Sequence, residues 1–354
     1  MLPYLVLLLL LLFSIIFDNT KYKWKVFYIN SFFLFIFCAF RGNGDGDYFT
    51  YIEYSKLIVS VNDVLDFTFP MEIGFRIISF FSNSLNLGGQ GVIILMSMLS
   101  LFPTFFIISK LSDKPSLSLL VFFPFFLIMD MHSSRTAVAA AFGLLGALSL
   151  FENRNVKASI FFAIAISFHS SAIILCLLLF RRCKLSSVII MMIFALVFQS
   201  VYGVKELLLT ILDSLGLDFF RMKVEIYLSQ EDYVYDIPLY DPRNILQIII
   251  SLLVIYYYRS IRTMSQSFEL NKMFAFGCVV FILFSDLAIF SIRLSYFFLI
   301  TSYIVVPILA HRLDLNCERS GLPRLSGSYL FAFAYSLMAS AIIFSYVEYV
   351  FYFG

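Results

Sequence analysis

The sequence predicts an all-α, polytopic transmembrane helical bundle, formed as one integral membrane domain over residues 1–354. Of its 354 residues, 61% are hydrophobic and only 14% are charged, an apolar excess typical of integral membrane proteins. Apolar stretches long enough to cross a hydrocarbon core of ~30 Å recur from end to end of the chain. Stretches of this length cross a bilayer as helices, because a helix satisfies its own backbone polar groups.

About eleven or twelve membrane segments are expected. The opening apolar stretch lacks a basic region and a small-residue cleavage site, so we expect a retained first helix rather than a signal peptide. The stretch 72–87 is too polar at one end for a full span and is interpreted as an amphipathic or half-inserted helix. The predicted segments are 2–17, 25–40, 91–109, 116–129, 135–151, 158–180, 185–203, 243–258, 273–290, 293–310 and 327–351.

The charge of the connections predicts the orientation. Acids outnumber bases in the two long connections, 41–90 and 204–242. Lys and Arg in short loops favour the cytoplasmic side, so the long acidic connections are expected outside, together with both termini. The short connections with a net positive charge, expected inside, are 18–25, 110–115, 152–157, 181–184, 259–272 and 311–324.

This orientation requires an unusual path for residues 158–180. Basic residues flank the stretch on both sides, at Lys157 and at Arg181, Arg182 and Lys184. Two short or re-entrant helices that meet at "FHSS" would keep both basic groups inside and bring His169 near the outer face. A single kinked helix with a local violation of the charge rule is the alternative.

Other sequence features favour packing rather than chemistry. The five cysteines stand singly and form neither a disulfide framework nor a zinc signature, and no P-loop or internal repeat is present. No cofactor, metal or nucleic-acid partner is therefore expected. Small residues at three- and four-residue spacing in 137–150, such as Gly143 and Gly146, predict close packing between membrane helices.

Ionisable residues gather at the predicted outer ends of the segments. Each alone has a structural explanation, since an interfacial arginine snorkels to headgroups and a lone histidine often satisfies a backbone group. Glu72 and Arg76 stand four residues apart on one predicted helical face, where they could pair. The full set is Arg41, Asp45, Asp47, Tyr48, Glu72, Arg76, Asp130, His132, Arg135, His169, Asp286 and Arg293.

The convergence of Arg41, Arg135 and Arg293 predicts an anionic ligand. Guanidinium binds phosphate bidentately and stays charged when partly buried. At the outer face of a membrane this suggests a lipid-linked pyrophosphate. Carboxylates and tyrosines suit sugars, and the acidic connection 204–242 is rich in both and could cover a glycan.

The sequence resembles the EpsG family of polysaccharide polymerases, relatives of the Wzy O-antigen polymerases. The resemblance covers roughly 36–300 and rests on the order of five loose motifs. One departure is an extra aspartate in the first motif, which leaves open whether Asp45 or Asp47 is the functional acid; Asp47 directly precedes Tyr48 and is preferred. The motifs are "FRGNGDGDYFTY", "EIGFR", "HSSRTAVAAA", "AISFHSSAIIL" and "SIRLSYFF".

The resemblance implies a transmembrane glycosyltransferase related to the C-type superfamily, with its active site facing outward from the bacterial cytoplasmic membrane. It would move a growing glycan from undecaprenyl pyrophosphate onto the non-reducing end of a new lipid-linked repeat unit in O-antigen, capsule or exopolysaccharide synthesis. The expected partners are the lipid-linked donor and acceptor and the bilayer, with a chain-length regulator protein as a further candidate.

This chemistry assigns roles to the polar residues. The arginines Arg41, Arg135 and Arg293 would stabilise the leaving pyrophosphate without a metal. His169 is the leading candidate for the base that takes the acceptor proton, with Asp47 and Glu72 as alternatives; Glu72 could instead only orient Arg76. The expected substrate-binding residues are Asp45, Tyr48, Tyr51, Arg76, His132 and Tyr296.

Two other functions fit the sequence less well. An O-antigen ligase would use the same donor with a lipid-A core acceptor, and sequence separates it only weakly from a polymerase. A lipid-linked oligosaccharide flippase would line a path through the membrane with charges and show internal pseudo-symmetry. Here the charges gather at one predicted face and no repeat is present, which argues against transport.

The predicted orientation can be tested by labelling single cysteines in intact cells with an impermeant reagent. Cysteine at Asn62 or Asp232 should react from outside, whereas cysteine at Arg182 or Arg259 should react only after permeabilisation. Labelling of position 182 from outside would contradict the split path of 158–180, since that path keeps both flanking basic groups inside.

Overall fold

The computed structural model describes residues 2–42, 47–66, 68–180, 183–216, 221–222, 225, 237–257, 265–319 and 326–345. These residues form helices joined by short connections, with no strand among them. The predicted all-α fold of a polytopic helical protein is confirmed. Contacts divide the chain into two compact units, Met1–Leu175 with Ser302–Gly354, and Cys176–Thr301.

Among the described residues, fewer helices have membrane-spanning length than the eleven or twelve segments that the sequence predicts. Four helices in the described part are long and apolar enough to cross a membrane, and a bent pair over 290–318 would make five. Several other predicted segments are shorter apolar helices, because breaks in the helix interrupt the apolar stretch. These are Pro115–Asp130, Asn155–Phe168, Ser186–Val201 and Asn244–Tyr256.

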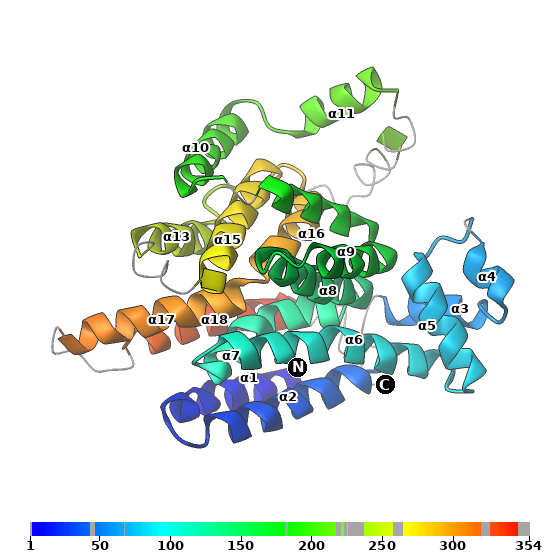
Figure 1. The fold of residues 1–354 in the computed structure, drawn as a ribbon, viewed down its shortest axis with the longest axis horizontal. Coiled ribbons are helices and arrows are strands. Elements are labelled where there is room, and N and C mark those ends of the chain that lie inside the picture. Colours follow the sequence, from blue (N-terminus) through cyan, green and yellow to red (C-terminus); the bar gives the residue numbers. More distant parts are fainter. Residues whose placement is uncertain are drawn as a thin grey trace. The chain divides into compact units, whose positions relative to one another are not determined.

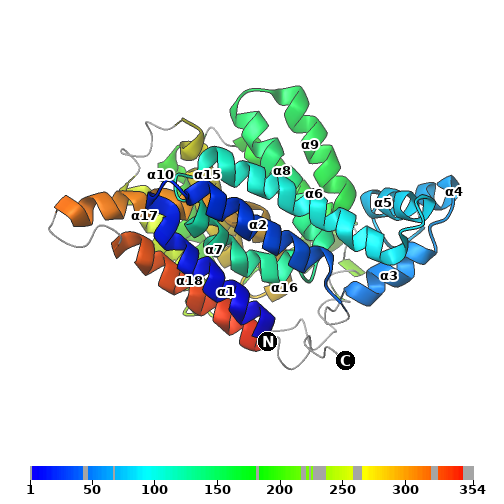
Figure 2. The same ribbon diagram turned by 90° about the horizontal axis from the view of Figure 1, so that it is seen from below.

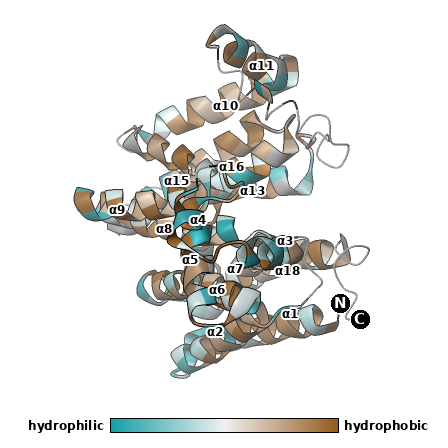
Figure 3. Cartoon of the chain, turned by 90° about the vertical axis from the view of Figure 1, so that its right-hand side faces the viewer, coloured by the Kyte–Doolittle hydropathy of each residue, from teal (hydrophilic) through white to brown (hydrophobic). Residues whose placement is uncertain are grey.

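The first unit is built around α7 (Pro115–Phe125), whose residues from Pro115 to Pro124 are all buried. It packs against α1 (Leu2–Ser14), α2 (Lys23–Ala39), α17 (Ser302–Arg319) and α18 (Ser326–Ser345). Figure 1 and Figure 2 show α1, α2 and α7 running alongside one another. Figure 3 shows mostly hydrophobic residues along α1 and α2, as expected for helices that face lipid.

The remaining helices of the first unit pack around α6 (Gly88–Leu111). It contacts α2, α8 (Ser134–Phe151) and two short helices, α3 (Tyr48–Lys56) and α5 (Ile73–Ser84). With α4 (Val61–Leu65), these short helices gather at one end of α6 (Figure 1). The helix α5 matches the stretch predicted to be amphipathic: Phe75 and Ile78 are buried, whereas Ile77 and Phe81 are exposed.

Small residues on α8 do allow the close packing that the sequence predicted. Ala139 and Ala147 are fully buried. A Cβ atom at Gly146 would lie 2.6 Å from the ring of Phe162 on α9 (Asn155–Phe168), and one at Gly143 would lie 2.5 Å from Leu175. Both distances are shorter than a normal carbon–carbon contact, so each glycine permits the neighbouring segment to approach.

These two contacts also reveal a chain reversal at His169. The α9 helix ends at Phe168, and a 3₁₀ helix, η3 (Ser170–Phe180), follows. Phe162 of α9 contacts Gly146 of α8. The backbone N–H of Ser170 donates to Glu72, which also forms an ion pair with Arg135 at the start of α8. Leu175 then contacts Gly143, which lies between Arg135 and Gly146 along α8. The chain therefore turns back along α8 after His169, while the number of times that 158–180 crosses the membrane stays a prediction.

The charged connections of the first unit meet at the end of its helices that lies opposite to Glu72 and Arg135. Both carboxylate oxygens of Asp18 accept N–H groups at the start of α7, from Ser116 at 2.8 Å and Leu117 at 2.9 Å. Lys114 forms a buried ion pair with Asp314. The predicted grouping of the connections 18–25, 110–115 and 311–324 therefore holds, while the side of the membrane on which they lie stays a prediction.

The second unit is built around α15 (Ser265–Leu283). It packs against α10 (Leu185–Val201), α13 (Pro242–Tyr256) and α16 (Ala288–Leu299). Its described apolar core joins α10 to α15 through Val188, Met192, Ala195, Ala275, Cys278, Val279 and Ile282. A further helix, α11 (Lys205–Ser214), begins soon after α10 ends.

The Asp18 contact generates a stability prediction. Asp18→Ala should lower the free energy of unfolding by about 1–3 kcal/mol, because it leaves two buried N–H groups at the start of α7 without an acceptor. The measurement is thermal unfolding of the detergent-purified variant. The matched control is Asp113→Ala, which removes an exposed carboxylate from the connection just before α7. Equal unfolding temperatures for the two variants would contradict the capping role.

Candidate active site

Arg135 occupies the centre of the polar residues that the first unit brings together. It lies in the first turn of α8, and its Nη1 forms an ion pair with Oε2 of Glu72, which precedes α5. The two side chains are 19% and 23% exposed, so the pair is shielded but still accessible. The guanidinium carbon also lies 5.8 Å from the centroid of the Tyr51 ring, within the range of a cation–π interaction.

Tyr51 connects this ion pair to Asp47. The tyrosine is fully buried on α3, and its hydroxyl donates to Oδ2 of Asp47 at 3.1 Å. Burial raises the pKa of Tyr51, and the negative charge of Asp47 raises it further. The hydroxyl therefore keeps its proton and fixes the carboxylate of Asp47 beside Arg135.

Glu72 also reaches the chain reversal at His169. Its Oε1 accepts the backbone N–H of Ser170 at 3.4 Å. The approach of α5 to α9 depends on Gly74, because a Cβ atom there would lie 2.8 Å from the carbonyl oxygen of Ser167. Asp47, Tyr51, Glu72, Arg135 and the His169–Ser170 junction are called the Arg135 cluster below.

His169 lies at the junction between α9 and η3, where the backbone orients its ring. Its backbone is extended at the end of α9, and only 9% of the residue is exposed. The ring Nδ1 accepts the backbone N–H of Ser171 at 3.2 Å. This hydrogen bond fixes the direction of the ring, and the role of His169 as a base stays a prediction.

Arg41 fixes the turn that carries Arg135. Its side chain is buried, with Nη1 donating to the carbonyl oxygen of Asp130 at 2.9 Å and Nη2 donating to Oγ of Ser134 at 2.6 Å. The π-helical turn η2 (Phe126–Asp130) ends at this contact. Such turns are frequent at functional sites. Arg41 thus positions the N-terminal end of α8, directly beside Arg135.

Three other predicted residues lie around the cluster. The hydroxyl of Tyr48 donates to Gln90 at 2.9 Å, and Gln90 donates to the carbonyl oxygen of Ala39 at 2.8 Å, which ties α3 to α6 and α2. Arg76 is buried and donates to the backbone carbonyl oxygen of Asp66. His132 is half-buried in the turn between η2 and α8.

The remaining predicted residues are outside this cluster or the described part. Arg293 and Tyr296 lie on α16 in the second unit, so their convergence with the other residues stays a prediction. Asp45 lies outside the described residues. Within the first unit, the structure joins Asp47, Tyr51, Glu72 and Arg135 directly, with Arg41 and His169 next to them in the chain or in space.

Two residues without a sequence-predicted role also hold this end of the first unit together. Ser134 receives the Arg41 hydrogen bond and donates to the carbonyl oxygen of Asp130 at 3.0 Å. Gln90 bridges three helices. Ser134 lies inside the "HSSRT" motif, and Gln90 is a single amide at the start of an apolar segment, so both positions carried a sequence signal.

The described residues contain no group of three or more His, Cys, Asp or Glu that could hold a metal ion. The Arg135 cluster combines a partly accessible guanidinium and two carboxylates near a helix N-terminus, with the His169–Ser170 junction beside Glu72. A helix N-terminus and an arginine both favour negative charge. This combination can bind an anion and a hydroxyl group side by side.

The sequence profile of the EpsG family matches residues 24–352, nearly the whole chain and all five motifs. The chain belongs to the EpsG family. No curated protein and no solved structure matches the chain. Membership of the EpsG family suggests a polysaccharide-polymerase-like function of the glycosyltransferase type, in a protein with membrane-spanning helices.

Proposed function

We propose that this EpsG-family protein polymerises a polysaccharide at the outer face of the bacterial cytoplasmic membrane. It transfers a growing glycan from undecaprenyl pyrophosphate to the non-reducing end of a lipid-linked repeat unit, without a metal. The observation that supports the proposal is the Arg135 cluster, in a chain of this family: a guanidinium pairs with Glu72 and lies over Tyr51, which bonds Asp47, and Glu72 also reaches the His169–Ser170 junction.

Arg135 is the residue best suited to the donor pyrophosphate. It is accessible, whereas both terminal nitrogens of Arg41 are engaged with the turn before α8. Arg41 therefore acts mainly by positioning Arg135 and the N-terminus of α8. Arg293 would add a second guanidinium contact from α16. Charge on the leaving phosphate grows in the transition state, so donors fixed in advance stabilise that state most.

The transfer needs one bond to form and one to break. The acceptor hydroxyl oxygen attacks the anomeric carbon of the donor sugar, and the bond from that carbon to the pyrophosphate oxygen breaks. The pyrophosphate leaves with the bonding electrons, and the hydroxyl proton passes to a protein base. The expected substrate-binding residues would line the path of the sugars. They are Asp45, Tyr48, Tyr51, Arg76, His132 and Tyr296.

Asp47 is the best candidate for that base. The Nδ1 of His169 already accepts the backbone N–H of Ser171, so this ring nitrogen is engaged. Glu72 is held by Arg135 and by Ser170. Asp47 accepts the Tyr51 hydroxyl at Oδ2, which orients its carboxylate within the Arg135 cluster.

The donor site can be tested with Arg135→Ala in a strain that lacks the chromosomal gene. We expect the loss of about 2–4 kcal/mol of transition-state stabilisation, by analogy with a lost oxyanion donor, and a collapse of long chains on glycan gels. Arg135→Lys should rescue poorly, since an ammonium cannot form the bidentate fork.

The matched control is Arg154→Ala, which breaks an exposed arginine–glutamate pair at the other end of α8. It should leave the chain-length distribution unchanged at equal protein levels. Retention of a single repeat in Arg135→Ala indicates a polymerase, whereas unattached lipid-linked polymer indicates a ligase and would overturn the proposed acceptor. Normal chains in Arg135→Ala would overturn the donor site.

The base is tested by comparing Asp47→Asn with His169→Gln. Asp47→Asn keeps an acceptor for Tyr51 but cannot take the proton, so it should lose the 10²–10⁴-fold that general base catalysis typically contributes. His169→Gln retains a hydrogen-bond donor and should keep partial activity. If His169→Gln abolishes chain extension and Asp47→Asn does not, the base is His169 in another tautomer, and the assignment of Asp47 is wrong.

A further inference from the structure

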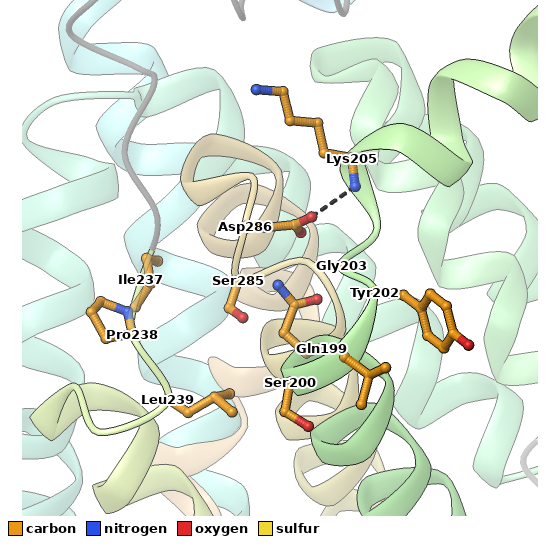
Figure 4. Close-up of a pocket in the computed structure, with 11 residues that line it drawn as sticks. Gln199, Ser200, Tyr202, Gly203, Lys205, Ile237, Pro238, Leu239, Ser285 and Asp286 are labelled. Atoms are coloured by element: carbon orange, nitrogen blue, oxygen red, sulfur yellow. Dashed lines mark hydrogen bonds between the residues drawn. The ribbon is translucent and has the colours of Figure 1, made fainter.

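The second unit contains a polar cavity that the proposed mechanism does not use (Figure 4). Its volume is about 480 Å³, within the ~300–1,000 Å³ typical of ligand pockets. The cavity lies between the end of α10, the start of α11, the segment 237–239 and the turn before α16. All of its lining residues belong to the second unit.

Asp286 lines this cavity and accepts two backbone hydrogen bonds. Its Oδ2 accepts the backbone N–H groups of Val204 at 2.6 Å and Lys205 at 2.7 Å, which caps the start of α11. Gly203 has a φ angle of +71°, and a Cβ atom there would lie 2.8 Å from the same oxygen. A glycine at this position thus allows the backbone to wrap around the carboxylate.

Two buried acceptor atoms remain after these contacts. Oδ1 of Asp286 and Oε1 of Gln199 are both buried and have no hydrogen-bond partner within the described part of the chain. A buried acceptor without a partner costs free energy, so such atoms in a cavity suggest a bound donor. Figure 4 shows the side chains of Gln199, Ser285 and Asp286 on one side of the cavity and Ile237, Pro238 and Leu239 on the other.

The chemistry of the two walls identifies the class of ligand. Asp286 and Gln199 accept hydrogen bonds, and the Ser285 carbonyl is already engaged by the N–H of Ile237 at 2.7 Å. A carboxylate repels phosphate, and the Lys205 side chain extends away from the cavity in Figure 4. A ligand with several hydroxyl donors and an apolar face fits both walls, which is the pattern of a neutral sugar ring.

We propose that this cavity is a glycan subsite that holds a sugar residue of the polymer or of the repeat unit through Gln199 and Asp286. The identity of the glycan rests on the proposed function. The class of ligand, a neutral sugar, rests on the residues that line the cavity. The sequence predicts the connection 204–242 to lie outside, where a growing glycan would be found.

The test measures binding separately from polymerisation. The detergent-purified full chain is titrated with the oligosaccharide repeat released by partial acid hydrolysis of the cell's own polymer, and binding is followed by saturation-transfer NMR. The variant Gln199→Leu should weaken binding by roughly tenfold or more, as expected for a lost buried hydrogen bond. Asp286→Asn keeps an oxygen to cap α11 but loses the charged acceptor, and it should weaken binding as well.

Gln247→Leu is the matched control. Gln247 lies on α13 of the same unit and also has a buried Oε1 without a partner in the described residues, but it does not line the cavity. Its replacement should leave glycan binding unchanged, and thermal unfolding compares the stability of all three variants.

The outcomes separate this inference from the proposed function. Equal binding by the wild type, Gln199→Leu and Asp286→Asn would overturn the subsite, as would a wild type that polymerises in cells but does not bind the oligosaccharide. Loss of binding in both cavity variants but not in Gln247→Leu supports it. If the protein binds the oligosaccharide through this cavity and yet makes no polymer, the polymerase proposal fails and the subsite stands.

Discussion

The ion pair between Arg135 and Glu72 joins the parts of the first unit that carry the candidate chemistry. Arg135 opens α8, Glu72 precedes α5, and the second oxygen of Glu72 holds the chain reversal that follows α9. Shielding an ion pair of this kind from water costs free energy, and hydrogen bonds to its remaining polar groups offset that cost. The N–H of Ser170 satisfies the second carboxylate oxygen of Glu72, and the Tyr51 ring lies against the guanidinium, so the pair depends on the elements that it connects.

The surrounding helices hold this pair through backbone contacts rather than through a rigid apolar core. Arg41 bonds the carbonyl oxygen at the end of the π-helical turn, and Gly74 allows α5 to approach the backbone of α9 within contact distance. Small changes at these positions would move Arg135 and Glu72 by fractions of an ångström. Transition-state stabilisation is sensitive to such shifts, because fixed donors act only when they are aimed at the developing charge.

The two ends of the first unit use charge differently. At one end Asp18 caps α7 and Lys114 is paired with a buried Asp314, which locks the helices together. At the other end the Arg135 cluster is partly exposed and combines donors and acceptors that a substrate could share. Charged groups that are shielded from water cost free energy unless they are paired, and both ends of the unit pair theirs.

The sequence by itself determined the helical class, the family motifs and the grouping of the basic connections, because these depend on apolar length, residue order and charge. It also indicated the chain reversal at His169, since basic residues flank that stretch on both sides. Only the tertiary structure decided which groups pair: Glu72 bonds Arg135, far along the chain, and Nδ1 of His169 accepts a backbone N–H. Ser134 and Gln90 gained their roles in the same way, because a side chain's partner is set by helix packing that local sequence does not encode.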